Sequence, residues 1–218
     1  QLDHPMLLIL PPELFTFIYS LLPCFMVFEH RTVCRSFKSQ LPSAVTEIDL
    51  SLLGPCRLRG DLEATMLFLK PLLPACEQLL SLSLQHAHIR DLGARSLAVI
   101  VNSGALPQLQ CLCLSHNEIG PAGAMALSLF LPSLSTSMKR LGLSNNPFGN
   151  EGVEFLTPAV QSLRSLEQLD LSFALPPFLP APIRDRGIPE SSFYALVAGL
   201  PRALQHLKLQ AHQIDSFA

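Results

Sequence analysis

One phrase of apolar residues recurs along most of this 218-residue chain. In its two clearest copies, three apolar residues spaced as Leu-x-x-Leu-x-Leu are followed by an asparagine and a further apolar residue. These copies consist of Leu109, Leu112, Leu114, Asn117 and Ile119, and of Met138, Leu141, Leu143, Asn146 and Phe148. With weaker copies included, the starts are Val45, Leu79, Leu109, Met138, Leu166 and Leu204, separated by 34, 30, 29, 28 and 38 residues. A recurring phrase of this period predicts a fold of stacked, similar units.

Each unit is expected to contain a short strand followed by a helix. Alternating leucines place one face of the strand inward, and the residues that follow have helical spacing. The expected helix faces are Leu92, Leu97 and Val101; Met125 and Leu129; and Val153, Leu156 and Val160. The turns from strand to helix carry Gly120, Gly123, Gly149 and Gly152. One unit cannot bury its own apolar face, so the sequence predicts an α/β solenoid with parallel strands on its concave side and helices on its convex side.

Asn117 and Asn146 occupy the same place in the two clearest copies. An amide side chain both donates and accepts hydrogen bonds, so these residues are predicted to bind buried backbone groups where the chain bends after a strand. Their predicted role is therefore structural.

The phrases LCLSHNEIGPAGAMAL and LGLSNNPFGNEGVEFL resemble the ribonuclease-inhibitor subtype of leucine-rich repeat. The resemblance covers residues 45–214 and implies a domain over residues 43–218. It also implies a surface that binds proteins and carries out no reaction itself. The high hydrophobic content of 49%, against 15% charged residues, agrees with a surface that another protein covers.

Residues 1–42 have a different pattern, in which Leu14, Phe17, Ile18, Leu21 and Leu22 form one apolar helical face. This segment resembles an F-box. That motif begins with Leu-Pro, has a second Leu-Pro after an apolar helix, and ends in Val-Cys-Arg. The matching residues are Leu10, Pro11, Leu14, Ile18, Leu22, Pro23 and Val33. The resemblance implies that the segment binds a Skp-type adaptor while the repeats hold a target protein, as in the substrate receptors of cullin-type ubiquitin ligases.

Some residues depart from the F-box pattern. Met26, Val27 and Phe28 replace an acidic residue and leucines, and Phe37 stands where tryptophan is common. The alternative is a helical cap on an accessory structural subunit of a large assembly, in which the partners are neighbouring subunits.

A proline-rich insertion at residues 173–189 lengthens one unit. Long irregular insertions are often functional or disordered, and both interpretations remain open here. The candidate partner-binding residues in it are Phe173, Phe178, Arg184 and Arg186. The last unit is expected to be thinly capped, because the residues after Leu209 are too few for a return helix.

The sequence contains no phosphate-binding loop, zinc-protease motif or nucleophile elbow. No catalytic residue or cofactor is therefore predicted. Cys111, Cys113, His86 and His116 have the chemistry of metal ligands, but two surface thiols are the preferred interpretation of the cysteines. A net charge of −2 and the absence of tryptophan argue against nucleic-acid binding.

Prolines interrupt the apolar stretch at residues 6–28, so a membrane span is not expected. The six cysteines form no recognisable disulfide framework. Free thiols indicate a reducing intracellular compartment, which favours the cytoplasm or nucleus without excluding an organelle.

Overall fold

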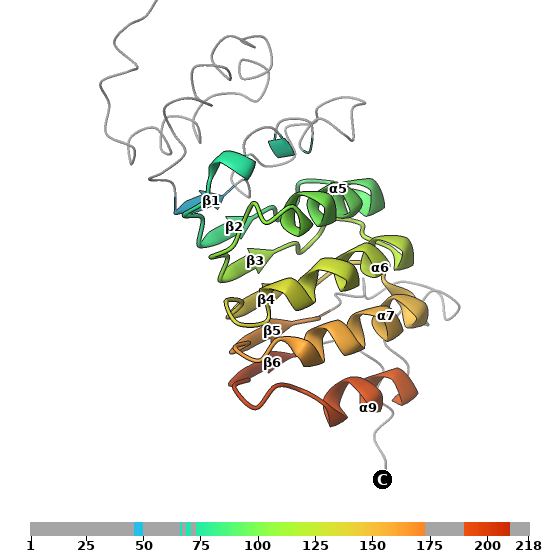
Figure 1. Ribbon diagram of the computed structural model, residues 1–218. Helices are drawn as coiled ribbons and strands as arrows, with labels where there is room; N and C mark the ends of the chain where they lie inside the picture. The colour runs from blue at the N-terminus through green and yellow to red at the C-terminus, as the bar shows by residue number, and fades with distance from the viewer. Residues whose placement is uncertain (1–45, 50–65, 67–68, 71–72, 173–189, 210–218) are drawn as a thin grey trace, which may run out of the picture.

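The computed structural model describes residues 46–49, 66, 69–70, 73–172 and 190–209 (Figure 1). The F-box-like segment and the insertion at residues 173–189 therefore lie outside the described residues, and so does the segment from residue 210 onward. The remaining residues contain the central repeats in full.

Six short strands carry the repeated apolar residues, one strand for each predicted start. They are β1 (Glu47–Asp49), β2 (Ser81–Ser83), β3 (Cys111–Cys113), β4 (Arg140–Gly142), β5 (Gln168–Asp170) and β6 (His206–Lys208). All neighbouring pairs are parallel, and the order in the sheet follows the order in the chain. The predicted parallel sheet is thus confirmed.

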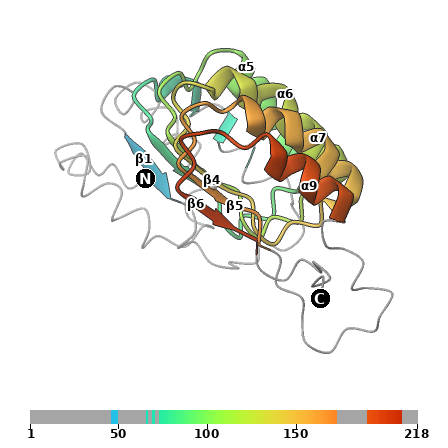
Figure 2. The ribbon, with the colours of Figure 1, turned by 90° about the horizontal axis from the view of Figure 1, so that it is seen from below.

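Helices follow the strands and lie together on one side of the sheet, as the two perpendicular views in Figures 1 and 2 show. They are α5 (Arg90–Asn102), α6 (Pro121–Phe130), α7 (Gly149–Ser162) and α9 (Glu190–Ala198). Short 3-10 turns occur at η3 (Leu73–Ala75) and η4 (Leu131–Leu134). Helix α6 packs between α5 and α7, and α9 packs against α7. The axes of packed helices are separated by about 8–10 Å, whereas paired strands are separated by about 4.8 Å. The stack must therefore curve, with the helices on its outer side.

The core lies between the sheet and the helices. Leu82, Leu112, Leu141 and Leu169 are aligned by the strand register and are at most 2% exposed. Burying one leucine side chain fully stabilises the fold by about 1.5–3 kcal/mol relative to leaving it exposed. Each central repeat buries several such side chains. Toward β6 the layer thins, since Leu207 is only partly buried. The stacked leucines therefore stabilise the central repeats more than this last described one.

Two glycines show why the turn from strand to helix needs a small residue. A Cβ atom on Gly123 would lie 2.5 Å from the Asp91 carboxylate and would also clash with Ile119. Gly149 has a φ of +63°, in the left-handed region that glycine enters at little cost. Gly123 thus allows α6 to begin close to the preceding repeat, and Gly149 allows the backbone to bend into α7.

The helix faces differ from the prediction at three leucine or methionine positions. Leu92, Met125 and Leu129 were expected to face the core, but they are 58%, 43% and 67% exposed. The inward positions of α6 are instead Gly123, Ala124, Ala126, Leu127 and Phe130. Gly123, Ala124 and Ala126 let the helix pack closely against its neighbours and the sheet, so that Leu127 and Phe130 fill the core while Met125 and Leu129 lie on the outer face.

Candidate functional site

The strand side of the sheet forms an open groove of about 760 Å³, lined by residues of all six strands. Two rows of side chains cross it, because the parallel register aligns equivalent residues. One row consists of Glu47, Ser81, Cys111, Arg140, Gln168 and His206. The other consists of Asp49, Ser83, Cys113, Gly142, Asp170 and Lys208. A partner lying across the strands would contact both rows.

The centre of the groove is lined by small residues. Gly142 lies beside Cys113 in the register, and a Cβ atom there would be 3.2 Å from the Cys113 sulfur. Ser115 and Ser144 follow the second row two positions farther along the chain, but they are only 5% and 8% exposed. The strands end at Cys113 and Gly142, so the alternation of faces does not extend to these serines. Ser115 and Ser144 therefore add little accessible polar surface to the two rows.

Arg140 is the main cation in the middle of the groove. Its Nε donates a hydrogen bond to Cys111 Sγ across 2.9 Å. This contact raises the pKa of Arg140, and the carboxylates of Glu47 and Glu167 act in the same direction. The guanidinium therefore stays charged, with nitrogen atoms left to bind a carboxylate or a carbonyl group.

The two cysteines and two histidines with the chemistry of metal ligands do not form one cluster. Cys113 Sγ is 3.6 Å from Ser115 Oγ, whereas the rings of His86 and His116 stack with centroids 4.1 Å apart. Within the described ranges, no group of three or more potential ligands is placed to hold a metal ion. Cys111 and Cys113 form no disulfide.

His116 lies at the rim of the sheet, where its ring nitrogen Nε2 is 3.0 Å from the Asn145 amide nitrogen. Burial lowers the pKa of His116, and the neighbouring His86 lowers it further, while Asp170 raises it. The neutral ring, which can accept a hydrogen bond from Asn145, is thereby favoured.

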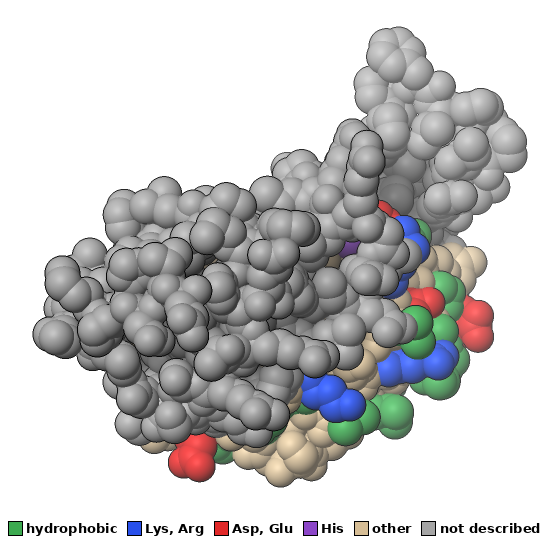
Figure 3. Space-filling view, turned by 90° about the horizontal axis from the view of Figure 1, so that it is seen from above, with side chains coloured by type: hydrophobic (Ala, Val, Ile, Leu, Met, Phe, Trp, Pro, Cys, Tyr) green, Lys and Arg blue, Asp and Glu red, His purple; other side chains and the backbone are tan. Residues whose placement is uncertain are grey.

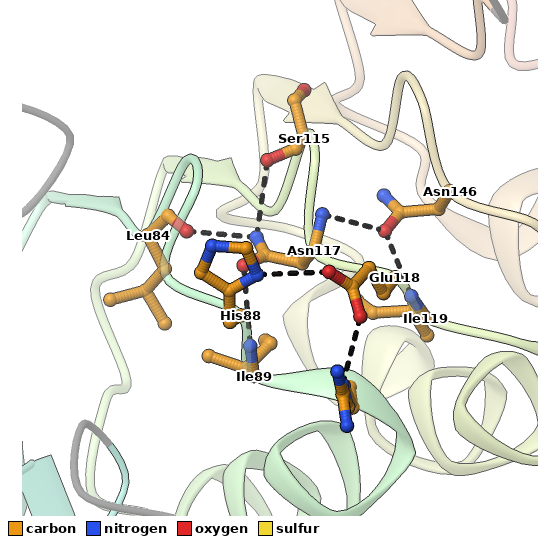
Figure 4. Close-up of polar contacts among 9 residues, drawn as sticks. Leu84, His88, Ile89, Ser115, Asn117, Glu118, Ile119 and Asn146 are labelled. Carbon is orange, nitrogen blue, oxygen red and sulfur yellow. Dashed lines mark hydrogen bonds and ion pairs between the residues drawn. The ribbon is translucent and has the colours of Figure 1, made fainter. Parts of the chain in front are cut away.

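Asn117 and Asn146 are buried, and Figure 4 shows their hydrogen bonds to neighbouring segments of the chain. Asn117 Nδ2 donates to the carbonyls of Leu84 and Ser115 at 2.8 and 3.2 Å. Its Oδ1 accepts from the backbone N–H of Ile89 at 3.4 Å. Each of these bonds fixes the bend between a strand and the following helix.

Asn146 repeats this arrangement one unit later. Its Oδ1 accepts hydrogen bonds from the backbone N–H groups of Asn117 and Ile119, both at 3.1 Å. Its Nδ2 donates to the carbonyls of Leu114, Leu143 and Ser144. The two asparagines therefore join three successive repeats through buried backbone groups.

Two further contacts join the repeats and were not identified from the sequence. The Asp91 carboxylate accepts from the backbone N–H groups of Gly120 and Gly123 at 2.7 and 2.9 Å, and so caps α6 from the neighbouring helix. The sequence did indicate that α6 needs a cap from elsewhere, because Gly120, the residue before the helix, has no side chain that could cap it. At the surface, Glu118 binds both His88 and Arg90. The hydrogen bond from His88 is the main reason why the pKa of Glu118 is lowered.

The predicted partner-binding residues of the first segment and of the insertion cannot be placed on this surface. Residues 1–45 and 173–189 lie outside the described ranges. In the part of the chain that is described, no helix combines the length and the apolar character needed to cross a bilayer.

Three segments match the family model described as Leucine Rich repeat, at residues 75–98, 106–128 and 134–156. These three segments are similar to leucine-rich repeats. These segments include β2, β3 and β4 and the first part of each of α5, α6 and α7. No curated protein matches the chain by sequence. Leucine-rich repeats generally mediate protein–protein interactions and are typically non-enzymatic, so the strand-side groove is the candidate protein-binding site.

Proposed function

We propose that this protein is a non-enzymatic receptor that holds a target protein in the strand-side groove. The observation that carries this proposal is the pair of aligned polar rows across six strands, which leaves a continuous open surface. A groove of this kind suits an extended segment or a loop of another protein.

The charges of the groove suggest how a target would lie. Glu47 and Asp49 are exposed on β1, whereas Lys208 and His206 lie on β6 at the opposite end. Arg140 lies between them, and arginine is among the residues that contribute most to protein interfaces. The target is therefore expected to present an acidic group to Arg140 on β4 or Lys208 on β6, away from the Asp170 carboxylate on β5, and a basic or polar group to β1.

The resemblance of residues 10–37 to an F-box supports a more specific role. In this proposal Leu10, Pro11, Leu14, Ile18, Leu22, Pro23 and Val33 bind a Skp-type adaptor. The adaptor would then join the bound target to a cullin-type ubiquitin ligase. Phe173, Phe178, Arg184 and Arg186 of the insertion are proposed as additional target contacts.

One observation favours the second candidate, an accessory structural subunit of a large assembly. Val99 and Leu129 are 66% and 67% exposed on the helix side. Neighbouring subunits of an assembly would cover such side chains. In that case residues 1–42 act only as a cap on the repeats.

Reconstitution with a purified Skp-type adaptor and cullin separates the two candidates. The receptor is expected to form a stable complex, and the double variant Ile18→Asp, Leu22→Asp is expected to lose it. Circular dichroism must show that the double variant remains folded. Failure of the folded wild-type chain to bind any Skp-type adaptor, together with its recovery in one large particle, would favour the structural subunit.

The groove is tested separately, with the target that is identified in the receptor complex. Ser83→Arg fills the small centre of the groove and Arg140→Glu reverses its charge, so both are expected to weaken target binding at least about tenfold. Glu77→Arg, at an exposed position in the turn before β2, serves as the matched control. Unchanged target binding in both groove variants would exclude the groove as the contact surface.

A further inference from the structure

The helix side carries an apolar patch centred on α6. This helix contains no charged residue. Met125 and Leu129 are 43% and 67% exposed on it, and Pro132 in η4 is also exposed. The neighbouring helices add Val99 from α5 and Pro158 from α7, which are exposed as well. Exposed apolar patches on a folded domain commonly mark a contact surface.

The positions of these residues follow from the repeat. Paired residues on β2, β3 and β4 are separated by 30 and 29 residues along the chain. Val99, Leu129 and Pro158 have the same separations, and so do Arg95, Met125 and Glu154. Because α6 packs against both α5 and α7, each set forms a row across the three helices. Figure 3, which views the molecule from above, shows hydrophobic side chains next to charged ones on the described part of the surface.

The charges in the second row are asymmetric. Arg95 on α5 and Glu154 on α7 are both exposed, and the uncharged α6 lies between them. The patch therefore has an apolar centre, a positive flank and a negative flank. Two copies of such a surface are complementary when a two-fold axis runs between them, parallel to α6. The positive flank of each copy then faces the negative flank of the other.

We infer that the occupant of this patch is a second copy of this chain, in a two-fold symmetric dimer. In that dimer α6 packs on α6 of the other copy, with Met125 and Leu129 at the centre, and α5 of each copy faces α7 of the other. Arg95 of each copy then pairs with Glu154 of its partner copy. The interface is isologous and closed. It lies on the side opposite the strand-side groove and does not depend on the proposed function.

The curvature of the stack agrees with this arrangement. The helix side is the outer side, so two copies that meet at α6 diverge toward α5 and α7. The short apolar side chains lie where the copies are closest, and the long Arg95 and Glu154 side chains lie where the gap is wider. Long charged side chains can bridge such a gap while their ends stay partly hydrated.

Sedimentation velocity of the 218-residue chain over a range of concentrations tests the inference. The wild type is expected to show a monomer–dimer equilibrium, and Leu129→Asp is expected to weaken it at least about tenfold, since it places a charge at the apolar centre. Met125→Ser is a second, milder variant of the centre. Circular dichroism and the thermal midpoint confirm that the variants are folded.

A charge exchange tests the two-fold geometry. Arg95→Glu alone and Glu154→Arg alone each create two like-charge pairs, and each is expected to weaken the dimer about tenfold at low salt. An equimolar mixture of the two variants restores both attractive pairs in the heterodimer. The control variants Arg164→Glu and Glu77→Arg change charge outside the three helices and are expected to dimerise like the wild type.

Three results would overturn the inference. A wild-type chain that stays monomeric at every soluble concentration means that another protein or the chain itself covers the patch. Assembly beyond the dimer contradicts a closed two-fold interface. A mixture of Arg95→Glu and Glu154→Arg chains that associates no better than either variant alone excludes the pairing of these flanks.

Discussion

The side-chain oxygen of Asn146 accepts a hydrogen bond from the backbone nitrogen of Asn117, 29 residues earlier in the chain, across 3.1 Å. This bond joins equivalent positions of two successive repeats, and both side chains are buried. The asparagines thus take the place of water for backbone groups that the stacking of the repeats removes from solvent.

Replacing Asn146 is expected to destabilise the fold strongly. Asn146→Ala leaves the buried N–H groups of Asn117 and Ile119 without their acceptor. Two unsatisfied buried groups cost about 3 kcal/mol or more in the free energy of unfolding. Urea denaturation measures this loss. Asn102→Ala, at an exposed position on α5, is the control and is expected to change stability little. Equal stabilities for the two variants would contradict the structural role of Asn146.

Enlarging Gly123 tests the close approach of α6 to the preceding repeat. Alanine normally favours a helix over glycine by about 1 kcal/mol. Here the added methyl group would clash with Ile119 and Asp91, so Gly123→Ala is expected to lower the free energy of unfolding by about 1–3 kcal/mol. Thermal or urea unfolding shows whether the variant is stabilised, as helix propensity alone would predict, or destabilised, as the clash predicts. Ser128→Ala, in the same helix, is the control, and a stabilised Gly123→Ala variant would show that α6 is packed less closely.

Removing the Asp91 carboxylate tests the cap that α5 provides to α6. Asp91→Ala deprives the Gly120 and Gly123 N–H groups of their shared acceptor. The expected loss is about 1–2 kcal/mol, as for other helix N-caps. Amide hydrogen exchange should also accelerate at these two glycines more than in α7. Unchanged exchange at both glycines would argue against this cap.

The stability of the protein should fall at mildly acidic pH because of His116. Its pKa is lowered in the folded state by burial and by His86, so the unfolded chain binds more protons as the pH falls through about 6.5. The contribution of neutral His116 is present above that value and is lost as the pH falls toward the lowered pKa. The measurement is the difference in unfolding free energy between about pH 7.5 and pH 5.5.

His116→Asn isolates this contribution. Asparagine does not titrate, and it tolerates the φ of +58° at this position. The free energy of unfolding of the variant is expected to depend less on pH than that of the wild type over the same interval. An identical pH dependence in both proteins would mean that His116 does not contribute.

Much of the sheet was predictable because the leucines alternate within strands. The predicted starts lead to strands whose central residues, such as Leu112 and Leu141, are buried and in register. The helix faces were less predictable. Met125 and Leu129 fit a helical period, but the period does not tell which side of a helix is inward when small residues such as Ala124 allow closer packing.

The sequence by itself determined the repeat, its parallel strands and the buried leucine frame, because a residue's place in a short strand decides the face to which it points. Only the tertiary structure decided which distant residues meet. Arg140 reaches Cys111, and Asp91 reaches Gly120, across 29 residues in both cases. These contacts depend on how one repeat stacks on the next. The strand register and the spacing of the helices determine that stacking, and both exist only in the folded chain.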